Sequence, residues 1–105
     1  MITLLNTSIL TAYGSYHYSP MDLDEVKAML AENEWQSAIG HESTAQVMST
    51  LLGVQVPVNR FQYYQDPGDK AIVFKLNGRP EEGKILGIEE IQAIGFTWGL
   101  LERTD

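Results

Sequence analysis

The sequence contains no cysteine, and it has only seven lysine and arginine residues against fourteen aspartate and glutamate residues. Without cysteine there are no disulfides, no thiolate metal site and no cysteine nucleophile. The net charge of −7 argues against a protein that coats long DNA or RNA, since such binding needs many cationic contacts to phosphates. No stretch is long and apolar enough to span a membrane, and the N-terminus does not resemble a signal peptide. We therefore expect a cytoplasmic protein with no membrane partner.

The chain of 105 residues predicts one domain, 1–105, and 44% hydrophobic residues suffice for a core. Five of the seven cationic residues fall between positions 60 and 84, namely Arg60, Lys70, Lys75, Arg79 and Lys84. A local positive region on an acidic protein suits a small anionic ligand. Ordinary solvated strand and turn residues give the same pattern, so both interpretations stay open here.

Hydrophobic periodicity and turn residues predict the element order β-α-β-α-β-β-α-β. Strands are expected at 2–6, 35–39, 60–65, 70–76 and 96–101. The turn signal at 66–69 makes the strands 60–65 and 70–76 a hairpin, and 11–18 is expected to be a loop or a short edge strand. The result is an α/β fold, a single small domain with a mixed sheet of about five strands flanked by about three helices.

The helix boundaries follow from capping residues. Ser19 as N-cap and Pro20 at the first helical position predict a first helix that ends near Asn33. A second helix is expected from His41 to Leu52, stopped by Gly53. The third is expected at 88–94, between two glycines.

The stretch 37–44 carries the strongest functional signal. It is typical of a buried strand end, a turn at Gly40 and the first turn of a helix, which is where α/β proteins often bind phosphate. His41 stands at the junction, and Ser43 and Thr44 follow with hydroxyls that face the same anion as the free backbone N–H groups. Asn6, Thr7 and Ser8 end the first strand and either line the same site or serve as plain turn residues.

The chemistry that these residues suit is phosphodiester cleavage. The imidazole of His41 exchanges protons near neutral pH, and Arg79 offers a planar fork for phosphate oxygens. Glu82 is placed to orient the histidine. Two alternatives stay open: His41 as a structural cap or a surface residue, and Arg79 paired with Glu82. No Walker loop, paired carboxylate metal cluster or serine nucleophile motif is present in the sequence.

The sequence resembles the viral ring nucleases, which act as type III anti-CRISPR proteins and degrade cyclic tetra-adenylate. The match covers nearly the whole chain in order. It is carried by Leu4-Leu5-Asn6-Thr7-Ser8, Ala38-Ile39-Gly40-His41-Glu42-Ser43-Thr44, Leu51-Leu52-Gly53, Asn59-Arg60, Arg79-Pro80-Glu81-Glu82-Gly83-Lys84-Ile85-Leu86 and Glu89-Glu90.

The resemblance implies a homodimer that cleaves the ring without metal or cofactor, by attack of the ribose 2′-hydroxyl on the adjacent phosphate. His41 would be the general acid, Arg79 would stabilise the transition state and Glu82 would support the histidine. Substrate contacts are expected from Asn6, Ser8, Gly40, Ser43, Thr44, Arg60 and Lys84. Two alternatives are a sponge or sensor that binds the ring without cutting it, and a small dimeric DNA-binding regulator, which the charge of −7 disfavours.

Overall fold

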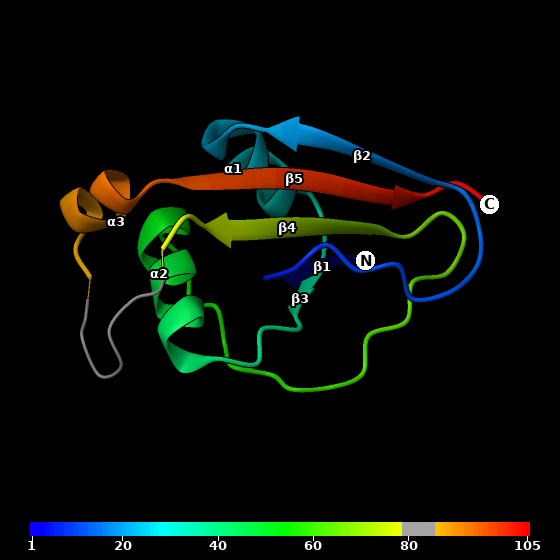
Figure 1. Ribbon diagram of the computed structural model, residues 1–105, viewed down its shortest axis with the longest axis horizontal. Helices are drawn as coiled ribbons and strands as arrows, with labels where there is room; N and C mark the ends of the chain where they lie inside the picture. Colours follow the sequence, from blue (N-terminus) through cyan, green and yellow to red (C-terminus); the bar gives the residue numbers. More distant parts are fainter. Residues whose placement is uncertain (79–85) are drawn as a thin grey trace.

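The computed structural model describes residues 1–78 and 86–105, and its centre is a five-stranded sheet with the strand order β2-β5-β4-β1-β3 (Figure 1). The strands are β1 (Ile2–Leu5), β2 (Tyr16–Met21), β3 (Trp35–Ser37), β4 (Lys70–Leu76) and β5 (Phe96–Arg103). The helices are α1 (Leu23–Glu32), α2 (Glu42–Leu52) and α3 (Ile88–Ile94). β1 pairs in parallel with β3 and β4, whereas β5 pairs antiparallel with β4 and β2. The predicted α/β class, mixed sheet and three helices are confirmed.

The prediction that the first helix begins at Ser19 and Pro20 is wrong. Both residues lie in β2, the edge strand that pairs with β5. Proline is tolerated there because an edge strand leaves one side of its backbone unpaired. α1 begins one turn later in a capping box: the Asp22 carboxylate accepts from the Glu25 N–H at 2.8 Å, and the Glu25 carboxylate accepts from the Asp22 N–H at 3.1 Å.

The predicted strand at 60–65 and its hairpin with 70–76 are also wrong. Residues 60–65 form no strand, and β4 lies between β1 and β5 instead. The turn at residues 67–68 is present. The alternation behind the prediction is real, because Tyr63 and Gln65 are buried whereas Gln62 and Tyr64 are exposed. It reflects a segment lying against one face of the sheet rather than a paired strand.

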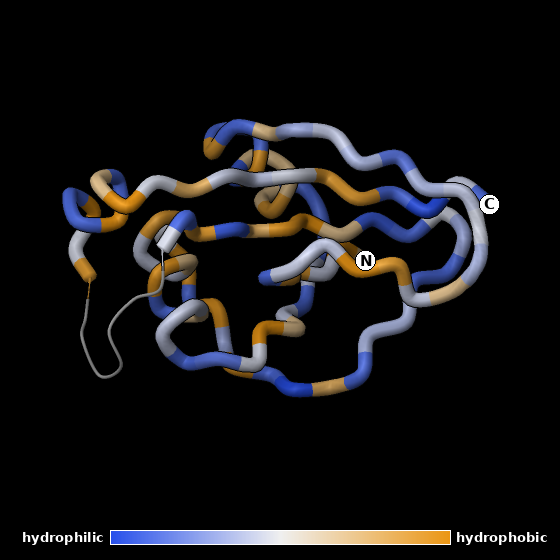
Figure 2. The backbone as a smooth tube through the Cα atoms, viewed as in Figure 1, coloured by the Kyte–Doolittle hydropathy of each residue, from blue (hydrophilic) through white to orange (hydrophobic). Residues whose placement is uncertain are grey.

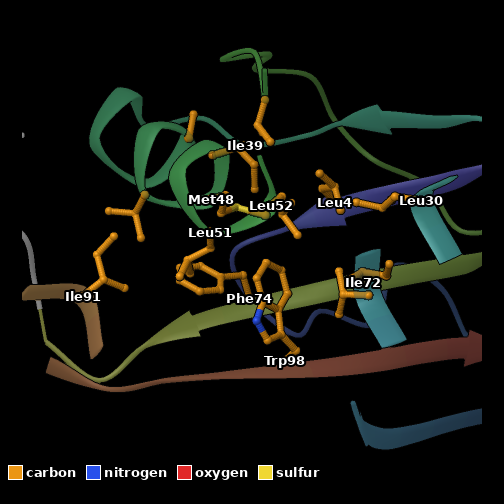
Figure 3. Packing of buried hydrophobic residues seen from close by; sticks show 14 of the residues in the cluster. Leu4, Leu30, Ile39, Met48, Leu51, Leu52, Ile72, Phe74, Ile91 and Trp98 are labelled. Carbon is orange, nitrogen blue, oxygen red and sulfur yellow. The ribbon is translucent and has the colours of Figure 1, made fainter. Parts of the chain in front are cut away.

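All three helices cover one face of the sheet. Ile72, Phe74 and Trp98 from the sheet pack there with Met48 and Ile91 from α2 and α3 (Figure 3). The Phe74 and Trp98 rings are tilted against each other, with centroids 4.7 Å apart. In Figure 2, β4 is hydrophobic along its middle, with hydrophilic residues on either side. Among the described residues, no helix is both long enough and apolar enough to cross a membrane.

The opposite face is covered by an irregular segment. We call residues 60–65 the strap; it belongs to the long green connection between α2 and β4 (Figure 1). Tyr63 inserts from the strap into a second, smaller cluster with Leu5, Ala71, Val73 and Leu101. This smaller cluster is the reverse side of the same sheet, since Ala71 and Val73 alternate with Ile72 and Phe74 along β4.

The strap is held at its far end by a buried side chain. The fully buried Gln65 donates its backbone N–H to the Thr11 hydroxyl at 2.8 Å and its amide to the Asp69 and Leu101 carbonyls. The Arg103 guanidinium donates to the Gln65 carbonyl at 2.7 Å and to the Tyr13 carbonyl at 2.9 Å. These bonds fix both the strap and the loop 6–15 to the end of β5.

Candidate active site

Three strand ends meet at one edge of the sheet. Because β1, β3 and β4 are parallel, their carboxyl ends all lie at this edge, which is where ligands bind in open α/β sheets. The Ala38 N–H donates to the Leu4 carbonyl at 3.0 Å, so β1 and β3 stay together beyond Ser37. Asn6, which follows β1, and Gly40, which follows β3, are thereby brought to the same corner of the molecule.

His41 stands at the start of α2, and its imidazole makes no capping hydrogen bond within the part of the chain that the structure describes. It is the N-cap residue, with φ −126° and ψ 129°, and its carbonyl accepts the first helical bond from Ala45 at 3.0 Å. Its side chain makes no capping hydrogen bond and is exposed. His41 therefore caps α2 through its backbone alone, and its exposed imidazole fits a surface residue as well as a ligand-binding one.

Two side chains that the sequence did not single out as site residues position this corner. The buried Ser37 hydroxyl accepts from the Ile39 N–H at 3.1 Å and donates to the Pro57 carbonyl at 2.6 Å. Asn59 donates its backbone N–H to the Ile39 carbonyl and its amide to the Ser37 carbonyl, both at 2.8 Å. Residues 57–59 are thereby fastened alongside 37–39, and the turn at Gly40 is fixed.

A signal for Ser37 was present, because a polar residue inside an apolar strand is usually hydrogen-bonded. No local pattern points to Asn59, whose amide bond to the Ser37 carbonyl spans 22 positions of the chain.

Arg60 brings a positive charge to the corner. Its Nε donates to the Gly40 carbonyl at 2.6 Å, and the guanidinium is exposed. A Cβ added to Gly40 would lie 3.1 Å from Arg60 Cγ, so the glycine lets the arginine lie against the turn. The predicted site residues Gly40 and Arg60 are thus in contact, next to His41. A cation and the orphan N–H groups of the α2 first turn both favour an anion here.

Asn6 lines a concavity of about 340 Å³ beside the corner. The other walls are the loop after β1 and the strap, with Leu10, Phe61 and Tyr64 among the lining residues. Ser8 is exposed and does not line it. Asn6 could therefore contact a ligand that extends from the corner into the concavity, whereas the structure does not bring Ser8 to this concavity.

Ser43 and Thr44 lie half-buried in the first turn of α2. The predicted site residues Arg79, Glu82 and Lys84 lie outside the described residues. β4 ends at Leu76, at the same edge of the sheet as Asn6 and Gly40. In the part of the chain that the structure describes, no group of three histidine or acidic side chains is arranged to hold a metal ion.

Tyr63 lies beneath the concavity. Its hydroxyl is buried near the Thr3 side chain without a well-formed hydrogen bond to any described residue. Burial raises the pKa of Tyr63 above its usual value of 10.0, and Asp69 and Asp66 act in the same direction. The ring therefore stays neutral at physiological pH and serves as an apolar anchor for the strap.

The family assignment rests on the match of residues 2–98 to a model described as STIV B116-like. The chain belongs to the STIV B116-like family. Its fold is that of B116 of Sulfolobus turreted icosahedral virus, whose solved structure superposes with a TM-score of 0.84 over 97% of this chain and 98% of that one, at 24% identity. The two proteins therefore share one fold.

Relatives of this B116-like protein occur in viruses and in a bacterium. Protein 26 of the Sulfolobus islandicus filamentous virus is 34% identical over 107 residues, covering 97% of this chain and 91% of its own. Protein ORF117 of Acidianus two-tailed virus is 34% identical over 109 residues, covering 98% and 93%. YddF of Bacillus subtilis is 35% identical over 106 residues, covering 99% and 98%. The protein thus belongs to a viral family that also has a bacterial member.

Proposed function

We propose that this protein is a metal-independent ring nuclease that acts as a homodimer in the host cytoplasm. Its substrate is cyclic tetra-adenylate, and its products are short linear oligoadenylates with 2′,3′-cyclic phosphate ends. Removal of this second messenger suppresses type III CRISPR immunity. The proposal combines the resemblance carried by the motifs around His41 and Arg79 with the geometry of the corner.

The observation that carries the proposal is the exposed imidazole of His41, uncommitted to capping, beside the Arg60 and Gly40 contact. A general acid must reach a leaving oxygen, so it needs a side chain that the fold does not already use. A phosphate placed against the α2 N-terminus meets backbone N–H groups, the Arg60 guanidinium and the imidazole together. Asn6 extends the contact surface toward the concavity, in which a neighbouring part of the ring is held.

In the proposed reaction the 2′-oxygen of one adenosine attacks the adjacent phosphorus, and the bond from phosphorus to the 5′-oxygen breaks. The 2′-hydroxyl releases its proton to the solvent, and His41 donates a proton to the departing 5′-oxygen and then takes one up from the solvent. The transesterification therefore consumes no water molecule and needs no metal ion. Arg79 stabilises the charge that develops on the phosphate, and Glu82 supports the protonated histidine. The linear product keeps a 2′,3′-cyclic phosphate.

The test is multiple-turnover cleavage of cyclic tetra-adenylate in excess EDTA. His41→Ala should lower the rate by about two orders of magnitude or more, the usual scale for a lost general acid, while binding stays within a few-fold. His17→Ala is the matched control, because it removes the other histidine, an exposed residue of β2. The control should cleave at the wild-type rate.

Other outcomes decide against the proposal in different ways. Tight binding of the ring without cleavage by the wild type would make the protein a sponge or sensor. Activity lost in EDTA and restored by a divalent ion would overturn the metal-free mechanism. Neither binding nor cleavage, together with a gel shift on duplex DNA, would favour the DNA-binding alternative.

A further inference from the structure

One of the clustered cations, Lys75, has no role in the proposed mechanism. Arg60 lies at the corner, whereas Lys75 stands in β4, one residue before the strand ends. Side chains of a strand alternate between the two faces of the sheet, and Ala71 and Val73 belong to the smaller cluster beneath the strap. Lys75 therefore faces the same side of the sheet as the concavity, and it is exposed.

The strand register places Lys75 near Asn6. Leu5, the last residue of β1, is paired with Val73 and lines the concavity. Asn6 follows Leu5 directly, and Lys75 follows Val73 by two residues on the adjacent strand. Because adjacent strands lie about 4.8 Å apart, Lys75 and Asn6 flank the same part of the sheet edge.

A tyrosine holds the ammonium group of Lys75. Lys75 Nζ lies 5.9 Å from the ring centroid of Tyr18, a residue of β2 that is 47% exposed. The ring reaches over β5 at Gly99, where an added Cβ would lie 2.7 Å from Tyr18 Cζ, so the glycine makes room for the ring. A cation–π contact holds the ammonium by its charge and does not use its N–H donors, which can still bind an oxygen anion.

The two lysines of β4 have different surroundings. Lys70, at the start of the strand, is paired with Glu102, a carboxylate that offsets its charge. Lys75 is paired with Thr97, which is uncharged, exposed and able to donate its hydroxyl to an anion. In Figure 1, where β5 lies in front of α1, no described segment lies in front of β5. An anion can therefore reach Lys75 from the solvent.

We propose that Lys75 binds a second phosphate of the ligand, next to the phosphate that Arg60 and the α2 N-terminus hold at the corner. The inference rests on the proposed function, in which the ligand is a cyclic oligonucleotide with several equivalent phosphates. Tyr18 is a positioning residue, because it acts through Lys75, and Thr97 adds a hydroxyl donor. Two separate phosphate contacts favour a ligand with at least two phosphodiester groups over a mononucleotide.

The experiment is calorimetric titration of the full chain, at several salt concentrations, with the 2′-deoxy form of cyclic tetra-adenylate. This analogue lacks the attacking hydroxyl and therefore stays intact. Lys75→Gln should raise the dissociation constant about tenfold at low salt. The slope of its logarithm against the logarithm of the salt concentration should fall by about 0.7, the loss expected for one phosphate contact on a single strand.

Lys70→Gln is the matched control, because it removes the same charge from the other end of the same strand. It should leave both the affinity and the slope unchanged. Tyr18→Leu, which keeps the lysine but removes the ring, should weaken binding several-fold without changing the slope. Thermal melting of each variant establishes that it is folded.

Equal slopes for Lys75→Gln and Lys70→Gln would overturn the inference, and unchanged affinity of Tyr18→Leu would remove Tyr18 as a positioning residue. Cleavage of cyclic tetra-adenylate separates this inference from the proposed function. A wild type that cleaves the ring while Lys75→Gln binds it normally refutes the second phosphate contact alone. A wild type that binds the ring with the expected loss in Lys75→Gln, but does not cleave it, refutes the nuclease alone. A wild type that binds no ring refutes both.

Discussion

The two faces of the sheet are covered in different ways. On one face three helices pack over large side chains such as Phe74 and Trp98. On the other face a single irregular segment crosses smaller residues such as Ala71 and Val73, held by one inserted ring, Tyr63. The helical face provides most of the buried apolar area, whereas the strap face leaves polar groups and backbone near the candidate site. The helical face therefore carries most of the core, and the concavity beside the candidate site lies on the opposite face of the same strands.

The largest effect of a substitution on the free energy of unfolding is expected on the helical face. Phe74→Ala should lower the free energy of unfolding by about 3–5 kcal/mol, because the helices over it cannot collapse into the space left by a fully buried ring. Tyr63→Ala should cost less, since the strap can settle toward the sheet. Chemical denaturation of both variants measures the difference, and equal losses would show that the two faces contribute alike.

A smaller effect on the free energy of unfolding is expected at Ser37, beside the candidate site. Ser37→Ala should cost about 1–3 kcal/mol, because the buried N–H of Ile39 loses its acceptor. The matched control is Ser49→Ala, at the opposite end of α2, whose hydroxyl likewise links two backbone groups, donating to Ala45 and accepting from Val56. Both should destabilise similarly, but only Ser37→Ala should weaken binding of cyclic tetra-adenylate, by several-fold. Calorimetric titration makes the comparison, and equal affinities of the two variants would remove Ser37 as a positioning residue.

The smallest effect on stability is expected from Tyr63→Phe, which removes a buried hydroxyl that has no well-formed hydrogen bond to any residue the structure describes. At pH 7 the stability should change by less than about 1 kcal/mol. Above pH 10 the tyrosine of the unfolded chain ionises while the folded one, whose pKa is raised by burial, stays protonated. The unfolded state then binds fewer protons, so wild-type stability falls as the pH rises. Denaturation at pH 9 and pH 11 should show a steeper loss for the wild type than for Tyr63→Phe, and parallel losses would contradict a raised pKa.

Much of the fold could be predicted because the signals were local. Gly53 ends α2 in the left-handed conformation with φ 70°, and Gly87 and Gly95 bracket α3 as expected. The first helix was misplaced because Ser-Pro competes with the acidic capping box of Asp22 and Glu25 as a start signal. The pairing partner then decided the outcome, since β5 holds residues 16–21 in the sheet. Local sequence does not reveal such a partner.

In the candidate site, too, the residues with a local sequence signal were predicted and the contacts between distant residues were not. Gly40 and His41 were predicted from the strand, glycine and helix pattern, which is written in consecutive residues. Arg60 was predicted as a site residue only from the resemblance. Its contact with Gly40 was not predicted, because it joins positions 20 apart through an irregular segment. The strap was predicted as a strand because apolar and polar residues alternate along it. Such alternation indicates that one side of the segment is buried, but it does not show that the backbone pairs with another strand.

The position of β1 between β4 and β3 has a consequence for how the chain folds. Its two neighbours come from distant parts of the sequence: Ile2 pairs with Trp35 in β3 and with Lys70 in β4. Closing such long loops makes contact formation slow. On the ribosome, the apolar segment Ile2–Leu5 must wait until β4 has emerged before both its edges are covered. The corner with His41 requires β1 and β3 to lie side by side, and it also requires the strap, which follows both in the sequence. The candidate site therefore forms late in folding, after β1, the first strand to be synthesised, has paired on both sides.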